Sequence, residues 1–183
     1  LHVSQHSFPT RRSSDPGLVV FGGDHLGPYP WRELAAEKAM ARAEELVRLF
    51  VSAGARKLHL DASMPLGGDS STGAGGRSGR ALESRVAAER AARLCAAAEE
   101  AFAASRAAER GALPPVYVIG TEVPPPGGER AAGTARPVGD EGRPLPTAPE
   151  DFVETVERHR EVFFGRGLAD AWDRVIAVVV QPG

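Results

Sequence analysis

Apolar and polar residues alternate along the chain in blocks that predict strands and helices in turn. Short apolar runs, bounded by Gly, Pro or Asp and rich in β-branched residues, have the length of buried strands. They lie at residues 18–21, 57–61, 116–119 and 175–180. The last run, VIAVVV, is apolar at every position and is predicted to be buried on both faces of a sheet.

Segments with a helical period separate these strands. They cover residues 31–53, residues 82–110 and a stretch that opens at Thr147, where Thr147 and Glu150 have capping-box spacing. Apolar residues at spacings of three and four predict the core faces of the first and third helices. These residues are Leu34, Ala39, Ala43, Leu46, Val47 and Phe50, and then Val153, Val156, Phe163 and Phe164.

Strands that alternate with helices predict an α/β fold of parallel strands joined by helical crossovers. A doubly wound open sheet and a closed barrel both satisfy this pattern, and composition does not separate them. Two irregular segments interrupt it, the Gly/Ser-rich residues 67–80 and the Pro-, Gly- and Arg-rich residues 120–146.

Composition narrows the class of protein. The chain has 183 residues, 42% of them hydrophobic, with 22 basic and 24 acidic residues and a net charge of −2. This balance favours neither nucleic acid nor a membrane as a partner, and no apolar run approaches the roughly 20 residues that span a bilayer. The single cysteine, Cys95, has the setting of a buried helix residue rather than a reactive thiol. A soluble, cytoplasmic protein is the prediction.

The first fifteen residues are treated apart from the fold. Residues 8–15, FPTRRSSD, can be translated codon by codon from a widely used sequencing-library adapter oligonucleotide. Residues 1–15 are therefore predicted to be a non-native tail, with a natural disordered basic arm as the alternative. The folded domain is expected within residues 16–183.

Polar residues follow each predicted strand, at the edge where parallel strands gather their ligands. They are Asp24 and His25, then Asp61 and Ser63, then Glu122, and finally Gln181. Alternation along the second strand directs Leu58 and Leu60 toward the helices, and Lys57, His59 and Asp61 to the opposite face. Turns also favour Asp, Gly and Ser, so a purely structural role for Asp61 stays open.

A zinc site would need about three His or carboxylate ligands and an open position. Among the histidines, His59 is predicted to be packed and hydrogen-bonded, and His159 to lie on a solvated helix face between Arg158 and Arg160. That leaves His25 with Glu122 or Asp61, so Zn²⁺ is possible but the ligand set is incomplete. No P-loop and no nucleophile elbow is present in the sequence.

Three stretches, FGGDHLGPYPW (21–31), KLHLDASMP (57–65) and VYVIGTEVPPPGG (116–128), together carry a specific resemblance. With ERAARLCAAAE (89–99) and RVIAVVVQPG (174–183), they resemble the GatZ/KbaZ family, the non-catalytic subunits of tagatose-1,6-bisphosphate aldolase. The resemblance implies a partial (β/α)₈ TIM barrel of the class II aldolase type, with about four strand–helix units. Because family members are longer, it also implies a fragment truncated at both ends.

The resemblance further implies what the residues do. Asp24 matches the proton-transfer carboxylate of class II aldolases, and His25 matches a zinc-binding histidine. Glu122 is similar to a glutamate near that zinc, whereas Gln181 stands where a further histidine ligand would be sought. The implied function is an accessory subunit in galactitol and N-acetylgalactosamine catabolism that binds a catalytic aldolase subunit, with a phosphorylated ketose possible at the rim formed by Asp61, Ser63, Glu122 and Gln181. The alternative is a protein that is itself an aldolase, an epimerase or a tagatose-6-phosphate kinase.

Overall fold

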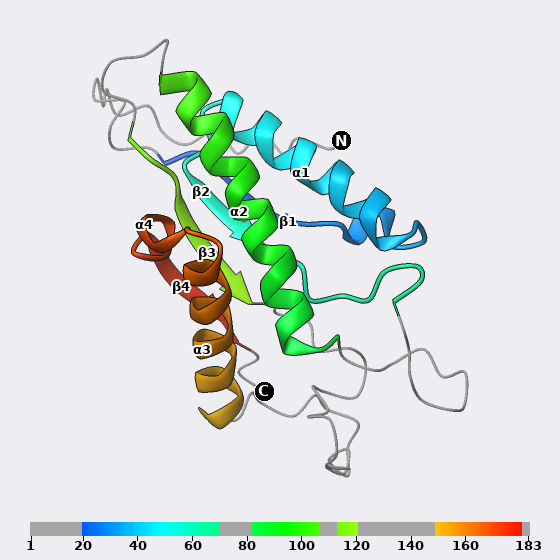
Figure 1. Ribbon diagram of the computed structural model, residues 1–183. Helices are drawn as coiled ribbons and strands as arrows, with labels where there is room; N and C mark the ends of the chain where they lie inside the picture. Colours follow the sequence, from blue (N-terminus) through cyan, green and yellow to red (C-terminus); the bar gives the residue numbers. More distant parts are fainter. Residues whose placement is uncertain (1–19, 70–81, 107–112, 121–148, 181–183) are drawn as a thin grey trace, which may run out of the picture.

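The structure, a computed structural model, describes residues 20–69, 82–106, 113–120 and 149–180 (Figure 1). The tail at residues 1–15 and most of both irregular segments lie outside these ranges, as do Glu122 and Gln181. The predictions made for them therefore stay predictions.

Four parallel strands form one sheet in the order of the sequence. They are β1 (Gly22–Leu26), β2 (Lys57–Leu60), β3 (Val116–Gly120) and β4 (Val175–Val179). Between them run α1 (Ala36–Ser52), α2 (Ser84–Arg106), α3 (Pro149–Gly165) and the short α4 (Ala169–Trp172), with a 3₁₀ turn, η2, at Tyr29–Trp31.

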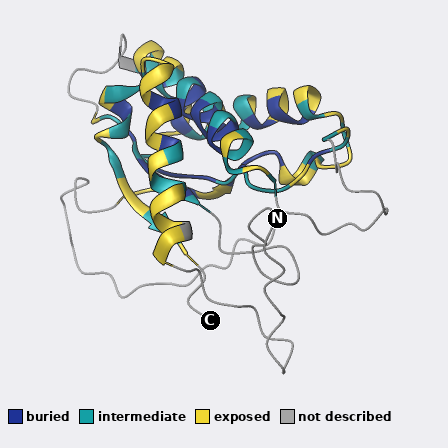
Figure 2. Cartoon of the chain, turned by 60° about the horizontal axis from the view of Figure 1, so that its bottom comes forward, coloured by how far each residue is buried: buried dark blue, intermediate teal, exposed yellow. Residues whose placement is uncertain are grey.

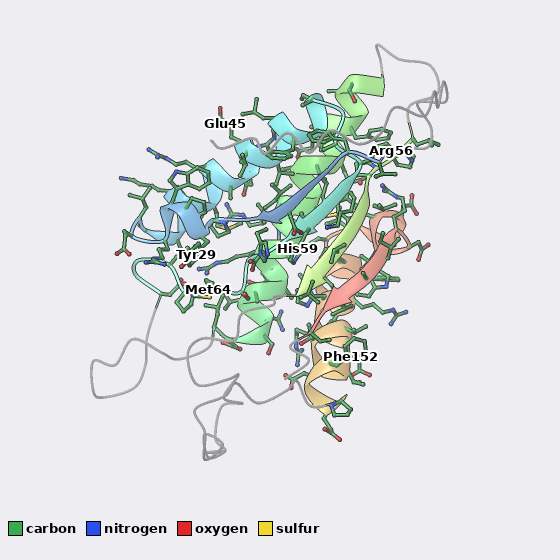
Figure 3. The ribbon with its side chains drawn as sticks, turned by 180° about the vertical axis from the view of Figure 1, so that it is seen from behind. Tyr29, Glu45, Arg56, His59, Met64 and Phe152 are labelled. Carbon is green, nitrogen blue, oxygen red and sulfur yellow. The ribbon has the colours of Figure 1, made fainter. Side chains whose placement is uncertain are left out.

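The helices settle the choice between the two predicted architectures. A doubly wound sheet reverses its strand order and carries helices on both faces. Here the order never reverses, and α1, α2 and α3 all cover the same face (Figure 1), while the view from behind shows the strands uncovered (Figure 3). Consecutive parallel units of this kind are what part of a (β/α)₈ barrel contributes, and the predicted fold class is confirmed.

The hydrophobic core lies between the sheet and its helices (Figure 2). The predicted alternation in β2 is confirmed, because Leu58 and Leu60 are buried on the helix side, where Tyr117 and Ile119 of β3 join them. Small side chains on the helices let them approach the sheet and one another closely. The helix residues of this core include Ala39, Met40, Ala43, Val47, Ala88, Ala91, Leu94 and Phe163.

The first strand begins later than its apolar pattern predicted. Residues 18–21 were expected to form it, but it runs from Gly22 to Leu26, and Val20 and Phe21 are exposed. Pairing with β2 decides the position, since Gly22 lies opposite Lys57 so closely that an added Cβ would meet the Lys57 carbonyl oxygen at 2.7 Å. The first helix likewise begins at Ala36 rather than at residue 31, after the proline-containing 3₁₀ turn.

The fourth strand differs from its prediction as well. Instead of being buried on both faces, β4 leaves Ile176 61% exposed, and Val180, which follows the strand, is 41% exposed. On the neighbouring α3, Phe163 is buried as predicted but Val153 and Phe164 are exposed. In the described part of the chain β4 pairs only with β3, so its other edge has no strand beside it there.

Candidate functional site

An irregular backbone at the carboxyl end of β1 presents two neighbouring side chains to different partners. The register with β2 shifts between Gly23 and Leu26, and His25 has a positive φ of 49°. Few residues other than glycine adopt that conformation, although histidine is among those that do so more often. As a result Asp24 contacts Lys57 and His59, whereas His25 contacts Asp61.

The next residues hold this irregular segment against β2. The Asp61 backbone N–H donates to the Leu26 carbonyl oxygen at 3.1 Å. Gly27 passes so close that a Cβ built on it would lie 1.6 Å from the Asp61 carbonyl oxygen. Only glycine fits at this position.

Asp24 receives two hydrogen bonds from β2. Lys57 Nζ donates to Asp24 Oδ1 at 3.2 Å, and His59 Nδ1 lies 3.0 Å from the same oxygen. Partial burial acts to raise the pKa of Asp24, but the hydrogen bonds and positive charge of Lys57 and His59 outweigh it, so the pKa lies below its usual value. Asp24 therefore stays ionised at neutral pH while its side chain remains 60% exposed.

His59 connects three strands on the face away from the helices (Figure 3). Its side chain is 1% exposed, and its Nε2 lies 2.9 Å from the carbonyl oxygen of Gly120 on β3. Because a carbonyl oxygen only accepts, Nε2 carries a proton and donates it. Nδ1 then faces Asp24 Oδ1 at 3.0 Å, a distance at which a proton can pass between the ring and the carboxylate.

His25 forms a second pair with Asp61. Its Nδ1 lies 3.0 Å from Asp61 Oδ2, and Ser63 Oγ donates to the other oxygen, Asp61 Oδ1, at 3.2 Å. In a neutral ring the carboxylate accepts the Nδ1 proton, and Nε2 then carries the lone pair. The His25 and His59 rings lie 4.9 Å apart between centroids, so the two pairs form one site.

The same residues include a possible cation site. Asp24, His25 and His59 each offer a ligand atom, and these atoms lie within 4.8 Å of one another. Two imidazoles and a carboxylate are a donor set that zinc accepts, and Asp61 supplies the outer carboxylate that usually orients a ligating histidine. His59 would have to exchange its contact with Asp24 for the metal, because Nε2 is committed to Gly120.

The structure therefore unites four of the residues that the sequence singled out: Asp24, His25, Asp61 and Ser63. The sequence placed His59 correctly as a packed and hydrogen-bonded residue, but it did not predict that His59 and Lys57 are the partners of Asp24. Their shared face with Asp61, set by the period of two along β2, was the signal that could have found them.

His159 was predicted on a solvated helix face, and this prediction is wrong. Its side chain is buried, and its Nδ1 donates to the Thr155 carbonyl oxygen at 2.8 Å. Burial lowers the pKa of His159 and keeps the ring neutral. The flanking arginines misled the prediction, because residues next to each other on a helix point in different directions.

Comparisons with known proteins agree on one family. A family model described as D-tagatose-1,6-bisphosphate aldolase subunit GatZ/KbaZ-like matches residues 4–183. A D-tagatose 6-phosphate 4-epimerase from Agrobacterium fabrum is 46% identical over 167 residues, 91% of this chain and 34% of that protein. A D-tagatose-1,6-bisphosphate aldolase subunit GatZ from Escherichia coli (strain SMS-3-5 / SECEC) is 44% identical over 165 residues, 90% of this chain and 34% of that protein.

A solved structure also resembles the chain. The crystal structure of a probable tagatose 6 phosphate kinase from Sinorhizobium meliloti 1021 matches with a TM-score of 0.66 and 38% identity, over 92% of this chain and 33% of that one. The chain thus spans about a third of the length of the relatives it matches. None of the helices in the described ranges is long and apolar enough to cross a bilayer.

Proposed function

Because the chain belongs to the GatZ/KbaZ-like family of D-tagatose-1,6-bisphosphate aldolase subunits, we propose that the complete protein binds a D-tagatose phosphate at the carboxyl ends of β1 and β2. Asp24 then takes up a proton from this substrate and returns it. One observation carries the proposal: Asp24 is ionised, largely exposed, and lies 3.0 Å from the Nδ1 of a buried histidine. The complete protein is a chain of the relatives' full length that contains these residues.

The relatives support the substrate class. An epimerase, an aldolase subunit and a probable kinase are named for different reactions, but each name contains a phosphate or bisphosphate of tagatose. What they have in common is therefore the sugar phosphate rather than the chemistry. Reactions that form or break bonds beside the carbonyl group or hydroxyls of a ketose need a group that takes up and returns a proton.

The described side chains divide this work between them. The Asp24 carboxylate accepts the substrate proton, and His59 and Lys57 hold the carboxylate in place and favour its charged form. His25, oriented through Asp61, lies beside the same carboxylate. In an alternative arrangement, with His59 released from Asp24, a divalent cation held by Asp24, His25 and His59 would polarise a substrate oxygen.

Activity of the complete protein alone tests the proposal. D-tagatose 6-phosphate and D-tagatose 1,6-bisphosphate are incubated with wild type and with Asp24→Asn, and epimerised and cleaved products are measured separately. Turnover by the wild type that falls by about two orders of magnitude or more in Asp24→Asn is expected for a proton-transfer group. Asp173→Asn is the matched control, because Asp173 is exposed and lies just before β4, at the opposite end of the sheet. Equal turnover by Asp24→Asn and wild type would refute the proposal.

An accessory role is the second candidate, and the aldolase subunits at 44% identity favour it. In that case a separate catalytic aldolase subunit is the partner, and this protein raises its activity and stability in the cytoplasm. The complete protein alone would then leave both substrates unchanged. Adding a catalytic subunit would give cleavage that survives Asp24→Asn.

A further inference from the structure

The segment that follows β2, residues 61–69, carries two residues of the proposed site at its start. Its other end is held in place by contacts outside the site. Asp61 and Ser63 stand at its start, where Asp61 contacts His25. Ala62 and Leu66 are buried in the core. The far end, from Leu66 to Asp69, makes no hydrogen bond with the site itself among those observed, and it is held by two other parts of the protein.

The first set of contacts consists of backbone hydrogen bonds between this segment and the residues that connect β1 to α1. The Gly67 N–H donates to the Arg32 carbonyl oxygen at 2.7 Å, and the Ala36 N–H donates to the Gly67 carbonyl oxygen at 3.1 Å. The approach is close enough that a Cβ on Gly67 would lie 2.7 Å from the Leu34 carbonyl oxygen. The two segments that leave the site are thus joined through their backbones.

The second contact is an ion pair between Asp69 of this segment and Arg90 of α2. Arg90 donates from Nη1 to Asp69 Oδ2 at 2.9 Å and from Nη2 to Asp69 Oδ1 at 2.5 Å. Asp69 Oδ2 also accepts the Leu66 N–H at 2.6 Å, so the carboxylate closes the turn it belongs to. Burial acts to raise the pKa of Asp69, but these donors outweigh it and the pKa lies below its usual value.

The Arg90–Asp69 ion pair has the features of an interaction that fixes the position of the segment rather than one that adds stability. Arg90 is only 6% exposed on an otherwise alanine-rich helix. A buried ion pair seldom stabilises a fold more than apolar residues of the same size would, because both charges lose their hydration. The paired guanidinium and carboxylate do fix a mutual orientation that apolar contacts leave loose.

We infer that Arg90 and Asp69 are positioning residues that hold Asp61 against His25, by fixing the end of the segment that carries Asp61. The inference rests on the proposed function for its consequence in catalysis. The contact it concerns, between Asp61 and His25, is measurable without any substrate.

Nitrogen NMR of the complete protein, labelled with ¹⁵N-histidine, measures that contact. At alkaline pH the wild type is expected to carry the His25 proton on Nδ1, where Asp61 accepts it. In Arg90→Met the Asp61 side chain is no longer held, so the Nδ1 resonance shifts toward that of an unprotonated ring nitrogen. Arg93→Met is the matched control, because Arg93 lies on the same helix but pairs with Glu37 and Glu44 of α1. It should leave the His25 resonances unchanged.

Arg90→Lys serves where Arg90→Met does not fold. It keeps the charge and loses the paired geometry, so a smaller shift in the same direction is expected. In a protein that turns over substrate, Arg90→Met should lower kcat about 10- to 100-fold, as loss of an orienting outer residue does, and change KM less. His25 resonances that stay at their wild-type positions in a folded Arg90 variant would overturn the inference. A complete protein without activity would refute the proposed function, while the resonances would still decide the positioning role.

Discussion

Two polar networks lie at opposite ends of the sheet. At the carboxyl ends of β1 and β2, Asp24 and His25 meet His59 and Asp61. At the amino ends of β3 and β4, the Glu99 carboxylate accepts hydrogen bonds from Arg174 at 2.9 and 2.7 Å and from the Tyr117 hydroxyl. Arg174 also donates to the carbonyl oxygens of Pro115 and Asp170.

The difference lies in where the charged atoms face. Glu99 and Arg174 are 26% and 21% exposed, and their hydrogen bonds connect α2, β3 and the start of β4. Asp24 and His25 are 60% and 42% exposed, on the side of the sheet that no described helix covers. A network whose polar groups are paired with one another holds elements together, whereas a network that exposes polar side chains on an uncovered face can bind a ligand. In barrels of this kind, chemistry gathers at the carboxyl ends and stability at the amino ends.

The largest effect expected from this comparison is on activity rather than on stability. Asp24→Asn should lower turnover of a tagatose phosphate about 10³-fold, since a positioned proton-transfer group contributes about 10²–10⁴. Its free energy of unfolding should change by less than about 1 kcal/mol, as for exposed polar sites. Chemical denaturation of both proteins measures the second quantity. A variant that loses several kcal/mol of stability would place Asp24 in the structural class with Glu99.

Arg174→Met should show the opposite behaviour. Removing the guanidinium leaves the Glu99 carboxylate, the Pro115 carbonyl and the Asp170 carbonyl without that donor, at an expected cost of about 2–4 kcal/mol. Activity per folded molecule should remain. Arg48→Met is the control, because its pair with Glu100 is exposed and should contribute less than about 1 kcal/mol. Equal losses in the two variants would show that the network at the amino ends has no special role.

These networks also show which parts of the structure could be predicted from the sequence. It predicted the alternation of strands and helices, the inward face of β2 and the pair Asp24–His25, because hydrophobic period and strand ends are local signals. It did not predict the pairing of Asp24 with Lys57 and His59, or the start of β1. Both depend on the register between strands that are more than thirty residues apart in sequence.

The errors on the α3–β4 side have a different origin. An apolar strand such as β4 predicts burial on both faces, and this burial depends on neighbours that the described residues do not contain. Glu122 and Gln181 lie outside the described residues, so their place at the rim stays a prediction. Their neighbours in sequence, Gly120 and Val179, do pair between β3 and β4.

A smaller effect concerns His159, which belongs to neither network. Its lowered pKa means that the unfolded chain binds this proton at a higher pH than the folded one does. Stability from the neutral buried ring is therefore complete above the unfolded value of 6.5 and is lost as the pH falls below it toward the folded pKa. The slope is at most about 1.4 kcal/mol per pH unit. His159→Gln should flatten the profile of unfolding free energy below pH 6.5, and an unchanged slope would contradict this.

The smallest effect expected is in the labelling of Cys95, and it tests whether the network at the amino ends is closed. Burial first, and then the charge of Glu99, raise the pKa of the Cys95 thiol to about 12. The reactive thiolate is therefore scarce at neutral pH, and the side chain is fully buried. Iodoacetamide should modify Cys95 only when the structure opens, which mass spectrometry of the peptide follows. Asp24→Asn should leave this slow rate unchanged because it alters the other end of the sheet, whereas Arg174→Met should accelerate it by loosening the residues around the thiol. Acceleration by Asp24→Asn would mean that the two networks are coupled. The carboxyl ends of the strands could then not be assigned to ligand binding and the amino ends to stability.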